Sequence, residues 1–77
     1  MEFNEEKIDE VIMALLYLNF HGSHGAVRAW KSFDWAAMDR LHDKGFVSDP
    51  KGKAKSVLVT EEGQRIAKEL FEKYFCS

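Results

Sequence analysis

The sequence predicts a mostly helical domain with a two-stranded β-hairpin wing, in the manner of a winged helix-turn-helix. Three observations support this. Apolar residues recur at helical spacing near both ends of the chain. A glycine ends a predicted helix over residues 35–44 and is followed by two short extended segments. Thr60-Glu61-Glu62-Gly63 then opens the last helix. The predicted order is helix, helix, helix, strand, strand, helix, in one domain spanning residues 1–77.

The first helix is expected from Asn4 to about Phe20. Asn4 is a good N-cap, and Glu5 and Glu6 follow where the helix dipole favours acids. This helix is apolar almost all round, so we expect one stripe to face the core and the other to need a cover. The expected core stripe is Ile8, Val11, Ile12, Leu15 and Leu16, and the second stripe is Met13, Tyr17 and Phe20.

Two further helices are expected before the wing. Residues 26–31 form a short second helix in this prediction, with Trp30 turned inward. Asp34 caps a third helix over 35–44, whose expected inner face is Trp35, Met38 and Leu41. Gly45 supplies the left-handed residue that ends it.

The wing is predicted from the segment after Gly45. Residues 46–48 and 56–59 are the two strands, and Asp49-Pro50-Lys51-Gly52 has the residue preferences of a type I turn. Thr60 caps the last helix. The apolar face of that helix is wide and consists of Ile66, Ala67, Leu70, Phe71, Tyr74 and Phe75.

The chain is expected to form a homodimer. A domain of 77 residues buries only about 60% of its unfolded surface, so a partner subunit would stabilise it. The first and last helices carry more apolar surface than one small core needs, and such patches mark interfaces. The predicted dimer interface is Met13, Tyr17, Phe20, Phe71 and Phe75.

Charge is unevenly distributed along the chain. Residues 1–20 carry a net charge of −4, residues 21–60 carry +3 and residues 61–77 carry −1. Lysines near the wing turn can contact phosphates, which makes duplex DNA a candidate partner. The alternative is that these lysines keep a hairpin tip soluble. The candidate nucleic-acid-binding residues are Lys51, Lys53, Lys55, Arg28, Lys31 and Arg40.

The helix over 35–44 occupies the recognition position, and its expected outer face is Ala36, Asp39, Arg40 and Asp43. Two aspartates beside one arginine are poorly suited to reading the major groove. We therefore expect any DNA binding to be weak, non-specific and led by the wing. The alternative function is a protein–protein adaptor that has kept the fold and lost the groove contacts.

No other chemistry is predicted. His21, His24, His42 and Cys76 lack the spacing of a metal site, and no catalytic residue or cofactor motif stands out. The first ten residues carry five acids and one lysine, so no signal peptide is expected, and no apolar run is long enough for a membrane span. A single cysteine fits a cytoplasmic location.

The second half of the chain resembles the recognition-helix-and-wing region of MarR- and PadR-type regulators. The residues that carry this resemblance are Leu41, Gly45, Phe46, Val47, Val59, Thr60, Glu61, Glu62 and Gly63. The whole chain is more closely similar to a family of uncharacterised bacterial proteins of about this length, a domain of unknown function. That similarity rests on residues 29–31, 34–35, 39–42, 44–45, 49–50 and 52–63. It implies a bacterial cytoplasmic protein with no assigned catalytic residues. The chain departs from the regulators in its abbreviated second helix and acidic third helix.

Overall fold

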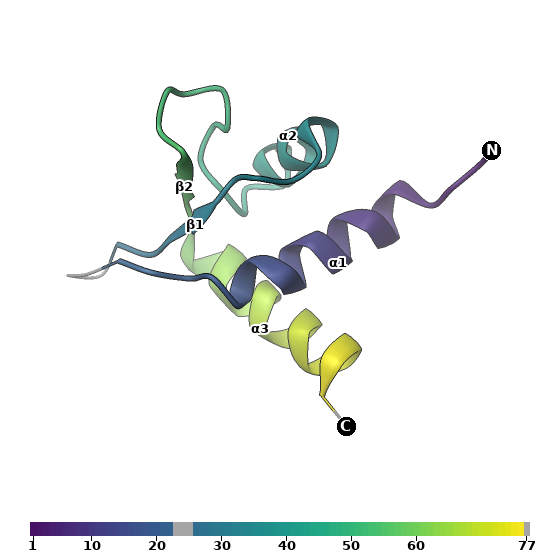
Figure 1. Ribbon diagram of the computed structural model, residues 1–77. Coiled ribbons are helices and arrows are strands. Elements are labelled where there is room, and N and C mark those ends of the chain that lie inside the picture. Colours follow the sequence, from purple (N-terminus) through teal and green to yellow (C-terminus); the bar gives the residue numbers. More distant parts are fainter. Residues whose placement is uncertain (23–25, 77) are drawn as a thin grey trace.

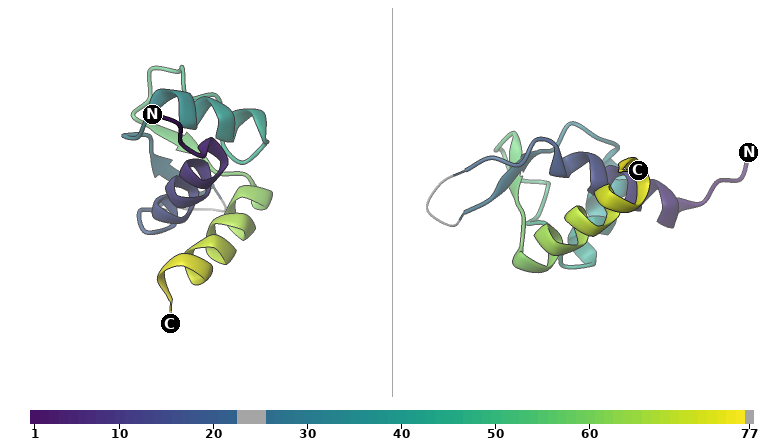
Figure 2. Two further views of the ribbon diagram at one scale, coloured as in Figure 1. Left: turned by 90° about the vertical axis from the view of Figure 1, so that its right-hand side faces the viewer. Right: turned by 90° about the horizontal axis from the view of Figure 1, so that it is seen from below.

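A computed structural model of the protein describes residues 1–22 and 26–76. These residues form α1 (Glu5–Tyr17), β1 (Arg28–Trp30), α2 (Trp35–Asp43), β2 (Ser56–Leu58) and α3 (Glu61–Phe75). Helix α1 lies between the other two helices and packs most extensively on α3 (Figures 1 and 2). The fold is therefore mostly helical with a two-stranded antiparallel sheet. The described residues contain three helices rather than the four predicted.

Helix α1 begins as the sequence predicts. The Asn4 side chain accepts a hydrogen bond from the Lys7 amide at 3.1 Å. The helix ends at Tyr17, earlier than expected, with Leu18 as its C-cap. The assignment of its two stripes was wrong in part, because Met13 is fully buried in the core beside Leu16. Two helices pack on α1 from different sides, so most of its circumference is covered.

The predicted helix over 26–31 is instead strand β1. It pairs antiparallel with β2, and Ala29 lies opposite Val57 at the centre of the register. Both of these residues are fully buried, whereas their neighbours alternate to the outer face. Trp30 is on that outer face and is 49% exposed, so the prediction that it points inward was wrong. Pairing with β2 satisfies the backbone of this segment, which a single helical turn would leave largely unbonded.

Helix α2 has the predicted ends. The Asp34 carboxylate accepts a hydrogen bond from the Ala37 amide at 3.1 Å, and Gly45 has the positive φ of 81° that a left-handed helix end requires. Met38 and Leu41 are buried as expected. Trp35 was predicted to lie on the inner face of this helix but is 77% exposed. It is the first residue of α2, and its side chain does not pack in the core.

The predicted hairpin is replaced by a looser arrangement. Val47 forms an isolated antiparallel bridge with Val59, and Ser48 N donates to Leu58 O at 2.9 Å. Strand β2 therefore lies between β1 and the segment around Val47. Residues 49–55, which we call the lysine loop, connect this segment to β2 on the α2 side of the molecule (Figure 1). The backbone amide of Lys51 donates to the Asp49 side chain at 2.9 Å, which stabilises the predicted turn.

Helix α3 begins at the predicted cap. Thr60 Oγ1 accepts from Gly63 N at 2.9 Å and donates to Gly45 O at 2.7 Å. One hydroxyl thus caps α3 and ties it to the end of α2. No helix among the described residues is long and apolar enough to cross a membrane.

We expect Thr60→Ala to lower the free energy of unfolding by about 1–2 kcal/mol, because it removes the cap and the bond to Gly45. Thr60→Ser should retain most of the stability. Thr60→Asp should fall between them, since a carboxylate can cap the helix but cannot donate to a carbonyl. Urea unfolding of the three variants measures these changes in the free energy of unfolding. Equal decreases for Thr60→Ser and Thr60→Ala would contradict the double role of the hydroxyl.

Candidate functional site

The lysine loop carries the three lysines that the sequence singled out. Lys51, Lys53 and Lys55 are all exposed. Within the part of the chain that the structure describes, none of their ammonium groups takes part in an ion pair. Three positive charges therefore face solvent within five residues of one another, and each is available to an anion.

Two other predicted residues hold the lysine loop in place. Lys31 Nζ donates to the carbonyl oxygens of Pro50 and Gly52, both at 2.6 Å. Arg28 Nε donates to Ser56 Oγ at 2.7 Å, and its Nη2 donates to Ser56 O at 2.9 Å. Lys31 and Arg28 were predicted to contact nucleic acid directly. In the structure their charged groups bond to the loop and to its junction with β2, so they shape the surface that the three exposed lysines form.

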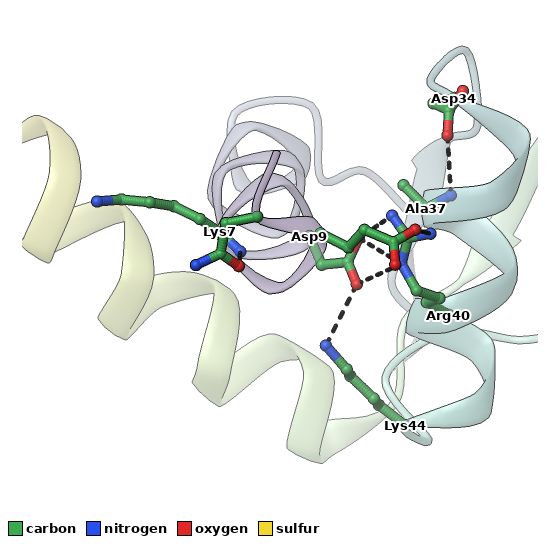
Figure 3. A network of polar contacts seen from close by, with 8 residues as sticks. Lys7, Asp9, Asp34, Ala37, Arg40 and Lys44 are labelled. Atoms are coloured by element: carbon green, nitrogen blue, oxygen red, sulfur yellow. Dashed lines mark hydrogen bonds and ion pairs between the residues drawn. The ribbon is translucent and has the colours of Figure 1, made fainter. Parts of the chain in front are cut away.

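Arg40 does not lie on the open outer face of α2 as the sequence suggested. Its Nε is 2.8 Å from Asp9 Oδ2, its Nη2 is 2.8 Å from Asp9 Oδ1, and its Nη1 is 2.9 Å from Glu5 Oε2. Lys44 Nζ also reaches Asp9, at 3.3 Å. Figure 3 shows the Asp9 carboxylate between these two basic side chains, where it joins α1 to α2. Arg40 is therefore committed to internal ion pairs.

Asp9 is the buried centre of this network, with an exposed fraction of 1%. Burial by itself raises the pKa of the Asp9 carboxyl, but the hydrogen bonds and charges of Arg40 and Lys44 outweigh burial and hold that pKa below the ordinary value of 3.8. The same contact with Asp9 raises the pKa of Arg40. Sequence reasoning missed Asp9. The available signal was its position one turn before Ile12 and Met13, on the core side of the helix.

The remaining surface of α2 is not basic. Ala36 and Asp43 are exposed and Asp39 is partly exposed, so acids dominate the face that would approach a groove. The element immediately before α2 is strand β1, so within the described residues no second helix joins α2 through a short turn to complete a helix-turn-helix pair. The acidic face agrees with the sequence analysis. The missing helix weakens the case for base reading further.

Both tryptophans of the chain border the lysine loop. Trp35 lines a small hollow of about 60 Å³ together with Lys31, Phe33, Met38 and Pro50. Trp30 lies at the other end of the loop, where it is opposite Ser56 in the sheet. The His21 ring stacks on Trp30 with a centroid distance of 4.5 Å and an interplanar angle of 26°. Neither indole was expected at the surface from the sequence.

A groove lies between α2 and α3, with one side of α1 also lining it, and has a volume of about 300 Å³. The apolar residues that line it are Met13, Leu41, Phe46, Ile66 and Leu70. Glu6, Glu10 and Glu69 stand among its polar lining residues. Part of this acidity is already paired, because Glu10 accepts a hydrogen bond from the Tyr74 hydroxyl and Glu69 is 3.1 Å from Arg65.

The residues predicted to form a dimer interface largely contact one another within the single chain. Tyr17 packs edge-on against Phe20 at a centroid distance of 5.5 Å and against Phe71 at 5.3 Å. Phe71 in turn contacts Phe75, whose side chain is exposed at the end of α3. Met13 is fully buried in the core. The cover that the second stripe of α1 required is thus supplied mainly by α3.

The histidines do not converge on a site in the described residues. His21 stacks on Trp30, and His42 Nδ1 lies 2.9 Å from the carbonyl oxygen of Val47. His24 lies outside the described residues. Within those residues, no group of three or more His, Cys, Asp or Glu side chains is placed to hold a metal ion.

Comparison with known proteins agrees with the similarity found in the sequence. The family model described as "Domain of unknown function (DUF6429)" matches residues 4–77. An uncharacterised protein of Sinorhizobium fredii, y4hR, is 48% identical over 75 residues, which covers 97% of each chain. No solved structure shows a significant match. The match over almost the whole chain shows that this protein belongs to the DUF6429 family.

Proposed function

We propose that the protein binds nucleic acid through its lysine loop, by contacts to phosphates rather than by reading base edges. The observation that carries this proposal is the group of three exposed lysines, Lys51, Lys53 and Lys55, which have no ion-pair partner among the described residues and lie on an anchored loop. A loop held by Lys31 and Arg28 presents its charges without first having to become ordered.

The arrangement of strands supports a reduced winged-helix interpretation. Strand β2 lies between β1 and the Val47 segment, and the lysine loop connects the last two as a wing would. The short helix that the sequence predicted before the recognition helix is strand β1 in the structure. We therefore propose a wing-led contact with duplex DNA that is weak and independent of sequence. A cytoplasmic location fits this role and stays a prediction.

The internal pairing of Arg40 supports the absence of base reading. Arginine is the side chain that most often reads guanine, and the Arg40 guanidinium is bound to Asp9 and Glu5. Moving it to a groove would leave the buried Asp9 carboxylate with Lys44 alone. The free-energy penalty would be several kcal/mol, which exceeds the free energy that one base contact provides.

We expect the protein to bind random-sequence duplex DNA with a dissociation constant on the order of micromolar at physiological salt. The logarithm of the binding constant should fall with the logarithm of salt concentration, with a slope of about −3 for one chain. If the homodimer predicted from the sequence forms, its six lysines give a slope of about −5. Fluorescence anisotropy measures the slope, and light scattering on the same sample gives the oligomeric state.

Two triple variants test whether the position of the lysines matters, because each removes three lysines from a different surface of the protein. Replacing Lys51, Lys53 and Lys55 with glutamine should abolish measurable binding at physiological salt. Replacing Lys7, Lys68 and Lys73, which are exposed on α1 and α3, should change it little. Equal effects of the two triple variants would show that net charge alone drives binding and would contradict the proposal.

A second candidate function is the protein–protein adaptor, and the groove between α2 and α3 favours it. A groove lined by both apolar and charged side chains suits an amphipathic segment of a partner protein. Part of α1 is also uncovered, since Ile8 and Val11 line a shallow apolar hollow, and the C-cap residue Leu18 is exposed. Failure of the wild-type protein to bind any nucleic acid at low salt would contradict the lysine-loop proposal and favour the adaptor.

A further inference from the structure

The two tryptophans of this chain are both conspicuously exposed. Trp30 is 49% exposed and Trp35 is 77% exposed, although they are the largest apolar side chains in the protein. A small domain has few large apolar residues with which to build a core, and leaving two indoles at the surface forgoes a large amount of apolar burial. Exposed aromatic side chains that lie together commonly mark a binding surface.

Trp35 lies next to one end of the lysine loop. It shares a small hollow with Pro50, the residue before Lys51, and with the aromatic ring of Phe33. Lys31 lines the same hollow and bonds to the Pro50 carbonyl, so the loop is fixed at this end. The exposed indole therefore lies beside Pro50, the residue that precedes the first lysine of the loop.

Trp30 lies next to the other end of the loop. It is opposite Ser56, the residue after Lys55, and the adjacent Lys31 amide donates to the Lys55 carbonyl at 3.2 Å. His21 stacks against the indole of Trp30, which restricts its orientation. The backbone thus places one tryptophan next to each end of the lysine loop, Trp35 beside Pro50 and Trp30 opposite Ser56.

The chemistry of this surface favours a particular class of ligand. Lysine is depleted in the cores of protein–protein interfaces, so three exposed lysines between two indoles do not suit a protein partner. Proteins that bind single-stranded nucleic acid combine positive charge along the backbone with aromatic rings on which successive bases stack. A duplex keeps its bases paired and stacked, so it would offer only its phosphates to this surface.

We propose that this surface binds single-stranded nucleic acid, with unpaired bases stacked on Trp35 and Trp30 and phosphates held by the lysine loop. This inference rests on the proposed function and deepens it by naming the class of nucleic acid. Stacking adds to the phosphate contacts that a duplex also makes, so single strands bind more tightly than duplex of the same length. Because every base has a π-face, the preference is largely independent of sequence.

Intrinsic fluorescence tests the stacking directly. In Trp30→Phe, Trp35 is the only tryptophan, and the phenyl ring can still stack on His21. Oligothymidine of about 15 nucleotides should quench this fluorescence as bases stack on Trp35. Inorganic polyphosphate, which has the charge but no bases, should compete for the lysines without comparable quenching. Equal quenching by both polymers, or binding of oligothymidine without quenching, would overturn the stacking model.

Affinity measurements separate this inference from the proposal on which it rests. Trp35→Ala should weaken binding of oligothymidine at least about fivefold and leave duplex affinity unchanged, and Trp35→Phe should retain most of the affinity. Trp35 is outside the core, so circular dichroism should show both variants folded. Equal binding of single strands and duplex, unaffected by Trp35→Ala, would overturn only the stacking. No binding of either polymer would overturn the lysine-loop function as well.

Discussion

Gly63→Ala should lower the free energy of unfolding by about 3 kcal/mol, although alanine is ordinarily the better helix former by about 1 kcal/mol. Gly63 is buried in the first turn of α3, where a Cβ atom would lie 2.2 Å from the carbonyl oxygen of Phe46. That oxygen is backbone, and it accepts a hydrogen bond from the Thr60 amide at 3.0 Å. The clash can be relieved only by moving α3 away from the segment after α2.

The control for this substitution is Gly52→Ala in the lysine loop. The nearest atom to a Cβ at Gly52 is Asp49 O at 4.0 Å, and the backbone there does not require glycine. We expect this variant to stay within about 0.5 kcal/mol of the wild type. Denaturant unfolding followed by circular dichroism measures both variants. A Gly63→Ala protein as stable as the Gly52→Ala protein would show that α3 does not pack this closely on Phe46.

Arg40→Met should lower the free energy of unfolding by about 3 kcal/mol at pH 7, because it leaves a buried carboxylate without its main partner. Asp9 is 1% exposed and receives bonds from both Nε and Nη2 of Arg40. Methionine keeps much of the aliphatic volume of the arginine, so loss of packing contributes little. Lys44, at 3.3 Å, remains as a weaker partner for the carboxylate.

The effect of Arg40→Met should depend on pH in a defined direction. In the wild type the pKa of Asp9 is below 3.8, so the stability that Asp9 contributes is present at neutral pH and is lost as pH falls through that depressed pKa. Without Arg40, burial raises the pKa of Asp9, and protonation in mild acid removes the buried charge. The difference in the free energy of unfolding between variant and wild type should therefore decrease as the pH is lowered from 7 to about 4.

Arg65→Met provides the matched control for the ion pairs. Arg65 makes pairs of 2.7 Å with Glu62 and 3.1 Å with Glu69, but all three side chains are more than half exposed. Exposed pairs of this kind contribute about 0–1 kcal/mol. Urea unfolding at several pH values compares the two variants. If Arg40→Met lowers the free energy of unfolding as little as Arg65→Met does, or by an amount that does not vary with pH, Asp9 is not a buried charged group.

The sequence by itself determined where the three helices begin and where α2 ends. Asn4, Asp34 and Thr60 cap the three helices, and Gly45 has the left-handed conformation that ends α2. Each of these features depends on a side chain and a backbone amide within a few residues of it. Such local interactions are the same wherever the helix packs, so they could be predicted without knowing the fold.

The sequence also indicated part of the candidate site. Three lysines around an Asp-Pro turn predicted an exposed basic loop, and residues 49–55 form one. The acidic face of α2 was likewise apparent from helical spacing alone. Exposure of this kind follows from the residue types themselves, because lysine and aspartate are buried only where a partner compensates their charge.

Only the tertiary structure decided the rest, because the deciding contacts join distant parts of the chain. Residues 28–30 form a strand because they pair with the backbone of β2. The Arg28–Ser56 contact between these two strands joins residues that are 28 positions apart in the sequence. Arg40 turns inward because Asp9, 31 residues earlier, lies buried beside it. Residue spacing along one helix defines its faces but cannot say which face a neighbour will cover. For the same reason, Met13 in the core and two exposed indoles beside the lysine loop became apparent only when the packing of the helices and strands was known.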